Sequence, residues 1–425
     1  MNLPSSLQPI PDRLAAVLPA PFSLPCRRML RGLLLLLLLG LGAAAPAANL
    51  FVKVENPGWP ATVPGAFLPV WGDYDGDEWI DLLLQIYLPD SGSNRMVNHL
   101  YRNNRDGTFT RKLAADVGPI VNDSPLHNAA CSTLFWVDVN NDGPLDLLVL
   151  ADCLSFDGTM PITGRLYRND GKGRFSSVEA GALTQPRPSL ASNWGCVADY
   201  DNDGWLDVFI LSAGEWVGYL NNLLLRGRGD GTLERVTNNT VALDESLGAW
   251  ACSWADIDND GDQDLLVESG AVADHPLYRN DGHGVFTRVT DRFRGAPIAG
   301  AWFGAWGDFD NDGDLDFVSA AGLAVNNGLG VFQWSEQDLE TDRFLGAAWV
   351  DIDNDGHLDF TMRSEVERSH EVLWYRNRGQ GTFERIENPL PGFAMPNAAY
   401  PFLAWGDYDN DGDMDAFVRS HLGTT

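Results

Sequence analysis

The sequence predicts an all-β fold: a seven-bladed β-propeller with a cation-binding loop between the first two strands of each blade. Two observations lead to this prediction. A nine-residue, aspartate-rich segment occurs seven times, and short strand signals accompany each copy. The first aspartates of successive copies lie 43 to 65 residues apart, about 56 on average. A four-strand unit repeated at this period is typical of propellers.

Each repeat contains strand signals in a fixed order. The first precedes the acidic segment (LGAAWV, residues 345–350), and the second follows it (LDLLVLA, residues 145–151). The third is an LYRN-type segment, as at residues 100–103 and 277–280, and the fourth is a Gly-x-Phe segment such as residues 107–112. Asn, Asp and Gly between these runs are typical of hairpin turns. All-β structure is therefore expected throughout the repeats.

A tryptophan stands two residues before the acidic segment in six repeats, and Val197 takes its place in the other. We expect these indoles to pack between adjacent blades rather than to bind a ligand. Small residues follow them, which suits crowded inner strands. The six are Trp71, Trp136, Trp254, Trp306, Trp349 and Trp405.

The acidic segments, here called loops 1 to 7, carry carboxylates at positions 1, 3, 5 and 9. Such carboxylates repel one another unless a cation lies between them, and hard oxygen ligands favour Ca²⁺ over zinc or copper. We expect five to seven Ca²⁺ per chain. The predicted ligands are Asp73, Asp75, Asp77 and Asp81 in loop 1; Asp138, Asn140, Asp142 and Asp146 in loop 2; Asp199, Asp201, Asp203 and Asp207 in loop 3; Asp256, Asp258, Asp260 and Asp264 in loop 4; Asp308, Asp310, Asp312 and Asp316 in loop 5; Asp351, Asp353, Asp355 and Asp359 in loop 6; and Asp407, Asp409, Asp411 and Asp415 in loop 7.

Two loops depart from the pattern. Glycine at position 6 allows a sharp bend at positive φ, and loop 1 has Glu78 there, so its geometry is expected to be the least regular. Loop 2 has Asn140 at position 3, loses one charge and should bind more weakly. An EF-hand begins with the same spacing but needs a glutamate at position 12 and flanking helices. Position 12 is never glutamate in these loops, so the loops are not EF-hands.

Composition restricts the possible partners. The formal net charge is −30, which argues against DNA, RNA or an anionic membrane surface. Hydrophobic residues make up 44% of the chain and 15 residues are Trp, so there is ample material for a core. The seven histidines are scattered, and no serine or cysteine has the context of a nucleophile. We therefore expect no catalytic residues.

The N-terminal region has the order of a secretory signal peptide. Arg27, Arg28 and Arg31 precede seven consecutive leucines (residues 33–39), and small residues follow up to Ala48. We assign residues 1–48 to the signal peptide with a possible N-terminal extension, and residues 49–425 to the propeller. Met29 is an alternative start, and an uncleaved anchor helix is the alternative to cleavage. The predicted location is secreted or extracytoplasmic, with no membrane span after cleavage.

Export would place the remaining cysteines in an oxidising compartment. If loop 2 joins two antiparallel strands, Cys131 and Cys153 face each other. The pair then forms either a cross-strand disulfide or two free thiols. For Cys196 and Cys252, which precede their loops by three and four residues, we expect buried free thiols.

The D-x-D-x-D-G-x-x-D loops and intervening LYRN…G-x-F segments resemble the FG-GAP (VCBS) repeats of integrin α-subunit propellers. They are closer still to repeats in secreted proteins of the cartilage-acidic-protein type. The resemblance covers residues 49 to 425. It implies a calcium-stabilised seven-bladed propeller that serves adhesion or ligand recognition. The globular domain that commonly follows such repeats in the secreted relatives is missing.

The ends of the chain are expected to close the ring together. LFVKVENP at residues 50–57 matches TFERIENP at residues 382–389, which is a fourth strand, so residues 51–54 should form the outer strand of blade 7. No LYRN-type segment follows loop 7, which indicates a truncated chain or a short last blade.

These observations predict an exported calcium-binding module, a monomer, that recognises an extracellular protein or glycan without catalysis. The alternatives are a carbohydrate-active enzyme, or the accessory propeller of a larger secreted enzyme. Arg228-Gly229-Asp230 spells an integrin-recognition tripeptide but aligns with a turn between the third and fourth strands, where coincidence is the simpler explanation.

Overall fold

The computed structural model describes most of residues 66–418. The described ranges are 66–90, 93–121, 133–152, 163–185, 194–211, 222–243, 249–269, 276–290, 292–294, 304–319, 321–335, 344–364, 371–379, 381–390 and 403–418, with residues 51–52, 54, 57–58, 337 and 339. The predicted signal peptide, Cys131 and Cys153 lie outside them.

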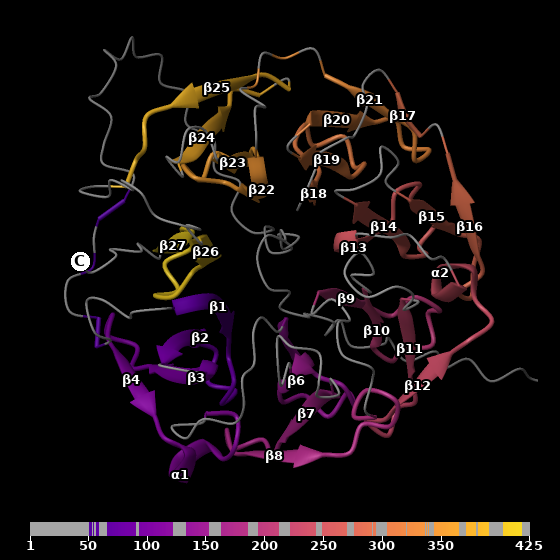
Figure 1. Ribbon diagram of the computed structural model, residues 1–425. Helices are drawn as coiled ribbons and strands as arrows, with labels where there is room; N and C mark the ends of the chain where they lie inside the picture. The colour runs from indigo at the N-terminus through magenta and orange to yellow at the C-terminus, as the bar shows by residue number, and fades with distance from the viewer. Residues whose placement is uncertain are drawn as a thin grey trace, which may run out of the picture.

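The described strands form seven sheets arranged around a central axis, as in a propeller (Figure 1). Blade 1 is β1 (Ala66–Gly72), β2 (Asp81–Asp90), β3 (Ser93–Asn103) and β4 (Phe109–Lys112). Blade 2 is β5 (Leu134–Val137), β6 (Asp146–Asp152), β7 (Thr163–Asn169) and β8 (Phe175–Val178). Blade 3 is β9 (Gly195–Ala198), β10 (Asp207–Ile210), β11 (Leu223–Gly227) and β12 (Leu233–Val236).

The second half of the ring repeats this order. Blade 4 is β13 (Ala249–Ala255), β14 (Asp264–Ser269), β15 (Leu277–Asn280) and β16 (Phe286–Val289). Blade 5 is β18 (Ala305–Gly307), β19 (Asp316–Ser319), β20 (Gly322–Asn326) and β21 (Phe332–Trp334), with a parallel fifth strand, β17 (Phe293–Arg294), beside β21. Blade 6 is β22 (Phe344–Val350), β23 (Asp359–Ser364), β24 (Glu371–Asn377) and β25 (Phe383–Ile386).

The prediction of seven blades needs correction, because the structure has six complete blades. The seventh sheet has only two described strands, β26 (Leu403–Gly406) and β27 (Asp415–Val418). No third-strand segment of the LYRN type follows loop 7, so β27 has no described partner on its outer side. We call this sheet blade 7. It lies beside β1 and completes the circuit of sheets (Figure 1).

Each loop is the hairpin connection between the first two strands of its blade, as predicted. The pairing has one register throughout: the residue before position 1 lies opposite position 9, as in Gly72 with Asp81 and Gly406 with Asp415. Because the strands are antiparallel, this register brings the two ends of the nine-residue segment together. Two short helices, α1 (Ala114–Val117) and α2 (Thr240–Leu243), follow fourth strands.

The tryptophans that recur two residues before the loops pack between blades. A side chain at Gly72, in blade 1, would collide with the indole of Trp136 in blade 2, and one at Gly307 would collide with Trp349. The Trp349 indole N–H also donates to the Ala305 carbonyl of the preceding blade at 3.0 Å. The small residues beside each tryptophan are therefore needed for close approach of the inner strands, as the sequence predicts.

The fourth-strand phenylalanine contacts the first-strand tryptophan of its own blade. Ring centroids are 6.1 Å apart for Phe109 and Trp71 and 5.7 Å apart for Phe175 and Trp136. In blade 7 the phenylalanine at this distance from Trp405 is Phe51, at 6.0 Å. Phe51 also lies 6.1 Å from Trp374 of blade 6. The N-terminal segment thus supplies the aromatic contact of a fourth strand, although Phe51 is not itself in a strand.

Cys196 and Cys252 are buried free thiols, as predicted. They lie on β9 and β13, the first strands of neighbouring blades, and burial raises the pKa of the Cys196 thiol, with Cys252 as a hydrogen-bonding neighbour. In the described residues no helix has the length and apolar character needed to cross a membrane.

Candidate functional site: seven acidic loops on one face

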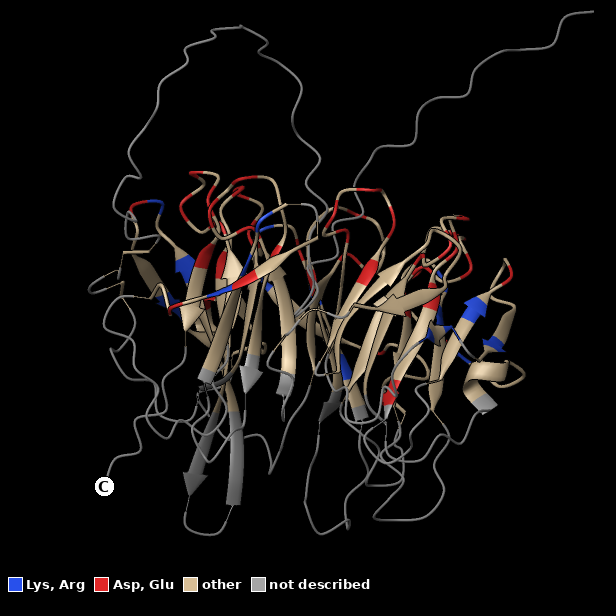
Figure 2. Ribbon diagram, turned by 90° about the horizontal axis from the view of Figure 1, so that it is seen from above, with Lys and Arg blue, Asp and Glu red and all other residues tan. Residues whose placement is uncertain are grey.

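The seven loops gather on one face of the ring, where Asp and Glu residues are concentrated (Figure 2). The opposite ends of the blades carry the connections between second and third strands. Three long inserts in the sequence fall at this end of the blades: residues 88–98, 152–164 and 212–222. In the structure residues 88–90 and 93–98 continue β2 and β3, and most of residues 152–164 and 212–222 lie outside the described ranges.

Position 1 organises each loop through its own backbone. In all seven loops its two carboxylate oxygens accept the N–H groups of positions 5 and 6, as when Asp199 accepts from Asp203 at 3.0 Å and Gly204 at 2.8 Å. The carboxylate of position 5 in turn accepts the N–H of position 7, as from Trp205 to Asp203 at 3.0 Å. Nine residues therefore fix the loop locally, before any contact with a neighbouring blade.

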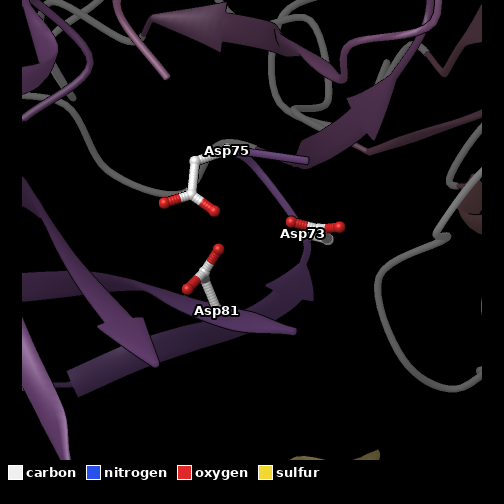
Figure 3. Close-up of side chains that lie close together, drawn as sticks. All are labelled: Asp73, Asp75 and Asp81. Atoms are coloured by element: carbon white, nitrogen blue, oxygen red, sulfur yellow. The ribbon is translucent and has the colours of Figure 1, made fainter. Parts of the chain in front are cut away.

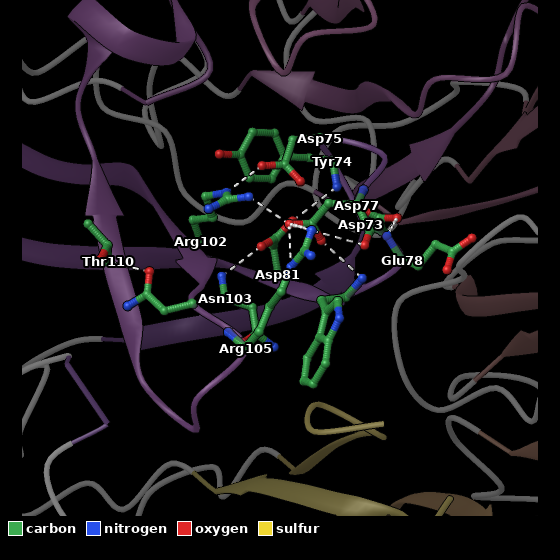
Figure 4. A network of polar contacts seen from close by, with 12 residues as sticks. Asp73, Tyr74, Asp75, Asp77, Glu78, Asp81, Arg102, Asn103, Arg105 and Thr110 are labelled. Atoms are coloured by element: carbon green, nitrogen blue, oxygen red, sulfur yellow. Dashed lines mark hydrogen bonds and ion pairs between the residues drawn. The ribbon is translucent and has the colours of Figure 1, made fainter. Parts of the chain in front are cut away.

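Position 9 connects the loop to the third strand. Asp81 accepts the N–H of Tyr74 at 3.2 Å and that of Asn103 at 2.8 Å (Figure 4). The same N–H from the third strand is donated in all six complete blades. Position 9 is buried, at 0 or 1% exposure in those blades, so it lies at the floor of the loop.

Burial raises the pKa of every position 9 carboxyl in the part of the chain that the structure describes. Loss of hydration is the largest cause, and nearby loop aspartates add to it; backbone N–H groups oppose it. The pKa is raised to about 8 for Asp81, Asp207 and Asp316. It is raised to about 7 for Asp146, Asp264 and Asp415 and to about 6 for Asp359. A nearby positive charge would reverse this effect.

The structure brings many of the predicted ligands close together. In at least five loops three carboxylate groups have oxygens within 4.8 Å of one another, and Figure 3 shows the trio Asp73, Asp75 and Asp81. Further trios are Asp199, Asp201 and Asp203; Asp256, Asp258 and Asp260; Asp308, Asp310 and Asp316; and Asp351, Asp353 and Asp355. The rest of the predicted set occupies the same positions of the same turns: Asp77, Asp138, Asn140, Asp142, Asp146, Asp207, Asp264, Asp312, Asp359, Asp407, Asp409, Asp411 and Asp415.

Position 3 carries an oxygen that a cation would satisfy. In six loops one side-chain oxygen of position 3 is buried and has no hydrogen-bond partner: Asp75, Asn140, Asp201, Asp258, Asp353 and Asp409. Burying a polar oxygen without a hydrogen bond costs free energy, so its repetition in six loops needs a physical explanation. The residues of the loop fit a hard divalent cation, which binds several oxygen ligands in a flexible turn and would pair with this oxygen.

The backbone of each loop bends at positions 4 and 6. In loops 2 to 7 position 4 is an asparagine with φ between 55° and 59°, and position 6 is a glycine with φ between 86° and 104°. Loop 1 reverses the residues: Gly76 has φ 72° and Glu78 has φ 69°. Glu78 thus takes the left-handed conformation that glycine adopts at position 6 of the other loops. Loop 1 nevertheless keeps the position 1 hydrogen bonds.

The position 4 asparagines link neighbouring loops around the ring, a role that the sequence reasoning missed. Asn141 donates to the Gly204 carbonyl at 2.7 Å, Asn202 to Asp262 at 2.6 Å, and Asn410 to the Glu78 carbonyl at 3.0 Å. Asn259, Asn311 and Asn354 make the equivalent links. Only the link from loop 1 to loop 2 has no donor, because Gly76 has no side chain. The Asn-Asp-Gly sequence that recurs at positions 4 to 6 of six loops was the available signal.

The asparagine of the LYRN-type segments is a second such link. Its backbone N–H binds position 9 of its own blade, and its side-chain amide donates to the position 2 carbonyl of the preceding blade. Asn169 donates to the Tyr74 carbonyl at 2.7 Å, and Asn103 to the Tyr408 carbonyl at 2.7 Å. The second of these bonds joins blade 1 to blade 7. Repetition of the LYRN segment was the sequence signal for it.

Comparison with known proteins supports the repeat assignment. The FG-GAP-like repeat pattern matches residues 73–149, 150–210, 199–267 and 364–418, more than half of the chain. The chain belongs to the FG-GAP-like repeat family. The matches begin at a loop or in a second strand, and each of them ends in the second strand of a later blade.

Two further similarities are informative. The chain is 26% identical over 186 residues to cartilage acidic protein 1 of Xenopus tropicalis, over 42% of this chain and 26% of that protein. The chain thus spans about a quarter of the length of this relative. A solved structure of an Agrocybe aegerita lectin, described as recognising non-reducing terminal N-acetylglucosamine, superposes with a TM-score of 0.55 at 19% identity. The match covers 85% of this chain and 87% of the lectin. This likeness shows the propeller fold.

Proposed function

We propose that this FG-GAP protein is an exported calcium-binding propeller that recognises a protein or glycan ligand without catalysis. The observation that carries the calcium proposal is the buried, unpartnered oxygen at position 3, repeated in six loops beside two or more further carboxylates. In this proposal positions 1, 3, 5 and 9 hold the ion. The ion would place a positive charge beside the buried position 9 carboxylates.

Calorimetric titration tests the metal proposal. Five to seven Ca²⁺ per chain are expected, with affinities of about 10⁻⁴–10⁻³ M, as in other extracellular modules. Chelation should lower the melting temperature, because an ion bound only to the folded state stabilises it. Two ions or fewer would refute the multi-site proposal.

Substitutions should grade the loops. Asp353→Ala removes a carboxylate that lies within 4.8 Å of two others, whereas Asn140→Ala removes a neutral side chain whose amide donates to Asp142 at 2.7 Å. The first should weaken calcium binding more than the second, and Asp310→Ala should resemble the first. Equal effects of all three variants on the calorimetric titration would contradict the assignment of position 3 as a charged ligand.

We favour recognition over catalysis because the described residues outside the loops offer no pair of carboxyls with a raised pKa. Apart from Glu268, every described carboxyl whose pKa is raised belongs to a loop. Glu268 lies on β14, and its described hydrogen bond is from the Gly304 N–H at 2.9 Å. A paired second carboxylate, which glycoside hydrolysis needs, is not described beside it. The carbohydrate-active enzyme and the accessory propeller therefore stay alternatives without a specific observation in their favour.

A glycan ligand is the more specific form of the recognition proposal. A structural neighbour with this fold is a lectin. A cavity of about 370 Å³ lies along β20 and β21 of blade 5, lined by Trp334, Gln333 and Arg294 among others, which combines apolar and polar surface. Glycan and protein arrays, screened with and without Ca²⁺, test the proposal. Gln333→Ala should reduce binding of any glycan that occupies this cavity, and Val285→Ala, at an exposed site on another blade, serves as the control.

A further inference from the structure

An arginine from the third strand contacts the acidic loop in several blades. In blade 3, Arg226 Nε lies 2.6 Å from Asp201 Oδ2 and its Nη2 lies 2.6 Å from Asp203 Oδ2. In blade 1, Arg102 makes the same two contacts, at 2.5 Å to Asp75 and 2.6 Å to Asp77 (Figure 4). One guanidinium thus bridges positions 3 and 5, which are two of the proposed cation ligands.

Other blades lack this bridge or make it weakly. In blade 6, Arg376 reaches position 3 alone, at 3.0 Å from Asp353. In blade 4, Arg279 instead binds Asp281 in the turn after its own strand, at 2.5 Å. Blade 5 has Val325 at the equivalent position and so has no arginine to offer. The chain therefore contains loops with and without a fixed positive charge.

The arginine is not needed to orient the carboxylate. Its contact uses Oδ2 of Asp75 and Asp201, while Oδ1 of both residues is the buried oxygen without a partner. The same Oδ1 is buried and unpartnered in Asp258 of loop 4, where the arginine is turned to Asp281. Because the loop backbone alone produces this orientation, the main contribution of the arginine is its charge.

We propose that the third-strand arginine sets the cation affinity of its loop. Loops 1, 3 and 6 carry their own counter-charge, keep their shape without Ca²⁺ and bind it weakly. Loop 5 has no such charge, depends on Ca²⁺ and binds it first. Since like charges oppose each other, a guanidinium on two ligands reduces the gain from a divalent cation. This inference rests on the proposed calcium function and adds to it the order in which the loops bind Ca²⁺.

The test uses Arg226→Gln with Arg228→Gln as its matched control. Both variants remove one positive charge, but Arg228 pairs with Glu234 in the turn between β11 and β12 and does not contact the loop in the described structure. Trp205 is position 7 of loop 3, so Tb³⁺ luminescence excited through tryptophan reports this loop. The emission that Trp205→Phe removes defines the loop 3 signal, and Ca²⁺ competition then gives its affinity.

Arg226→Gln should bind Ca²⁺ about ten-fold more tightly at loop 3 than wild type or Arg228→Gln, the size expected for two partly exposed ion pairs. Its melting temperature in chelator should fall, because Asp201 and Asp203 lose their counter-charge. An unchanged or weaker affinity would overturn the inference while leaving the calcium function intact. Complete failure of the wild-type chain to bind Ca²⁺ by calorimetry would overturn both.

Val325→Arg provides the reciprocal experiment if Arg226→Gln does not fold. The new arginine should raise the melting temperature in chelator and reduce the further increase that Ca²⁺ produces. Val325→Gln, which is long but neutral, is the control and should do neither. An equal calcium response in the two variants would also overturn the inference.

Discussion

The complete blades and blade 7 differ in packing but not in loop structure. The second strand of blade 3, β10, is buried at all four residues, whereas all four residues of β27 are half-buried. Yet Asp407 of loop 7 accepts the same two N–H groups as its counterparts, at 3.1 Å each. The loop is encoded by its own nine residues, while the core of a blade depends on third and fourth strands.

Phe51 allows the largest test of this comparison. Phe175→Ala, in complete blade 2, should cost about 3–5 kcal/mol of unfolding free energy, because the ring is only 3% exposed. Phe51→Ala should cost about 2 kcal/mol, since Phe51 is half-buried but contacts Trp374 and Trp405. Denaturant unfolding measures both. Val52→Ala is the control, because Val52 is 82% exposed.

A Phe51→Ala variant as stable as the Val52→Ala variant would show that the N-terminal segment does not close the ring. Deletion of residues 49–54 should have a larger effect than Phe51→Ala and promote aggregation, because it would remove the segment that carries Phe51 and expose the apolar surface of Trp374 and Trp405.

The sequence predicted those parts of the fold that repeat locally. The loops, their register and the interblade tryptophans follow from short patterns that recur along the chain. For blade 7 the sequence predicted an outer strand at residues 51–54. Phe51 contacts Trp405 as that match implies, but the described residues of the segment form no strand. A pattern match alone could not give this outcome, because a fourth strand needs a third strand to pair with and no LYRN-type segment follows loop 7. The links made by Asn141 and Asn169 were also missed, since a hydrogen bond to the next blade leaves no signal except recurrence of the asparagine.

Burial of the second strand in complete blades can be tested through Glu268. This residue of β14 is 2% exposed, and burial raises its pKa to about 7 from an ordinary value of 4.5. The protonated form is favoured in the folded state, so its stability is fully present below about pH 4.5 and is lost as the pH rises through about 7. Glu268→Gln should therefore exceed wild type in stability by about 3 kcal/mol at pH 8 and match it at pH 4.5.

Gln85 is the counterpart of Glu268 in blade 1, four residues after position 9, so the variant makes blade 4 resemble blade 1. Denaturant unfolding across pH 4.5–8.5 measures the difference. Because the loops titrate equally in both proteins, parallel stability curves would show that Glu268 is not the cause.

The ring of loop-to-loop links gives a smaller test at the contact between blades 7 and 1. Asn410→Gly removes the bond to the Glu78 carbonyl, and Asn141→Gly removes the bond to the Gly204 carbonyl between two complete blades. Glycine keeps the positive φ of both positions, so each variant should lose about 1 kcal/mol from the hydrogen bond. If Asn410→Gly alone has no effect on unfolding, loop 7 is held less firmly than the loops of complete blades.

The link that is missing between loops 1 and 2, where Gly76 stands in place of asparagine, gives the smallest and most specific test. Gly76 has φ 72°, a conformation that asparagine tolerates, and nothing lies within 4 Å of the position a Cβ would take. Gly76→Asn should therefore stabilise the protein by about 0.5–1 kcal/mol, because it restricts the unfolded chain and can donate to the Gly143 carbonyl, the counterpart of Gly204. Gly76→Ala, which meets the same φ without an amide, should destabilise it. Denaturant unfolding compares the two variants. If Gly76→Asn is no more stable than Gly76→Ala, the asparagine does not form the hydrogen bond to loop 2. Loops 1 and 2 would then be placed differently from the other neighbouring loops, and the missing side chain would not be the reason that the link is absent.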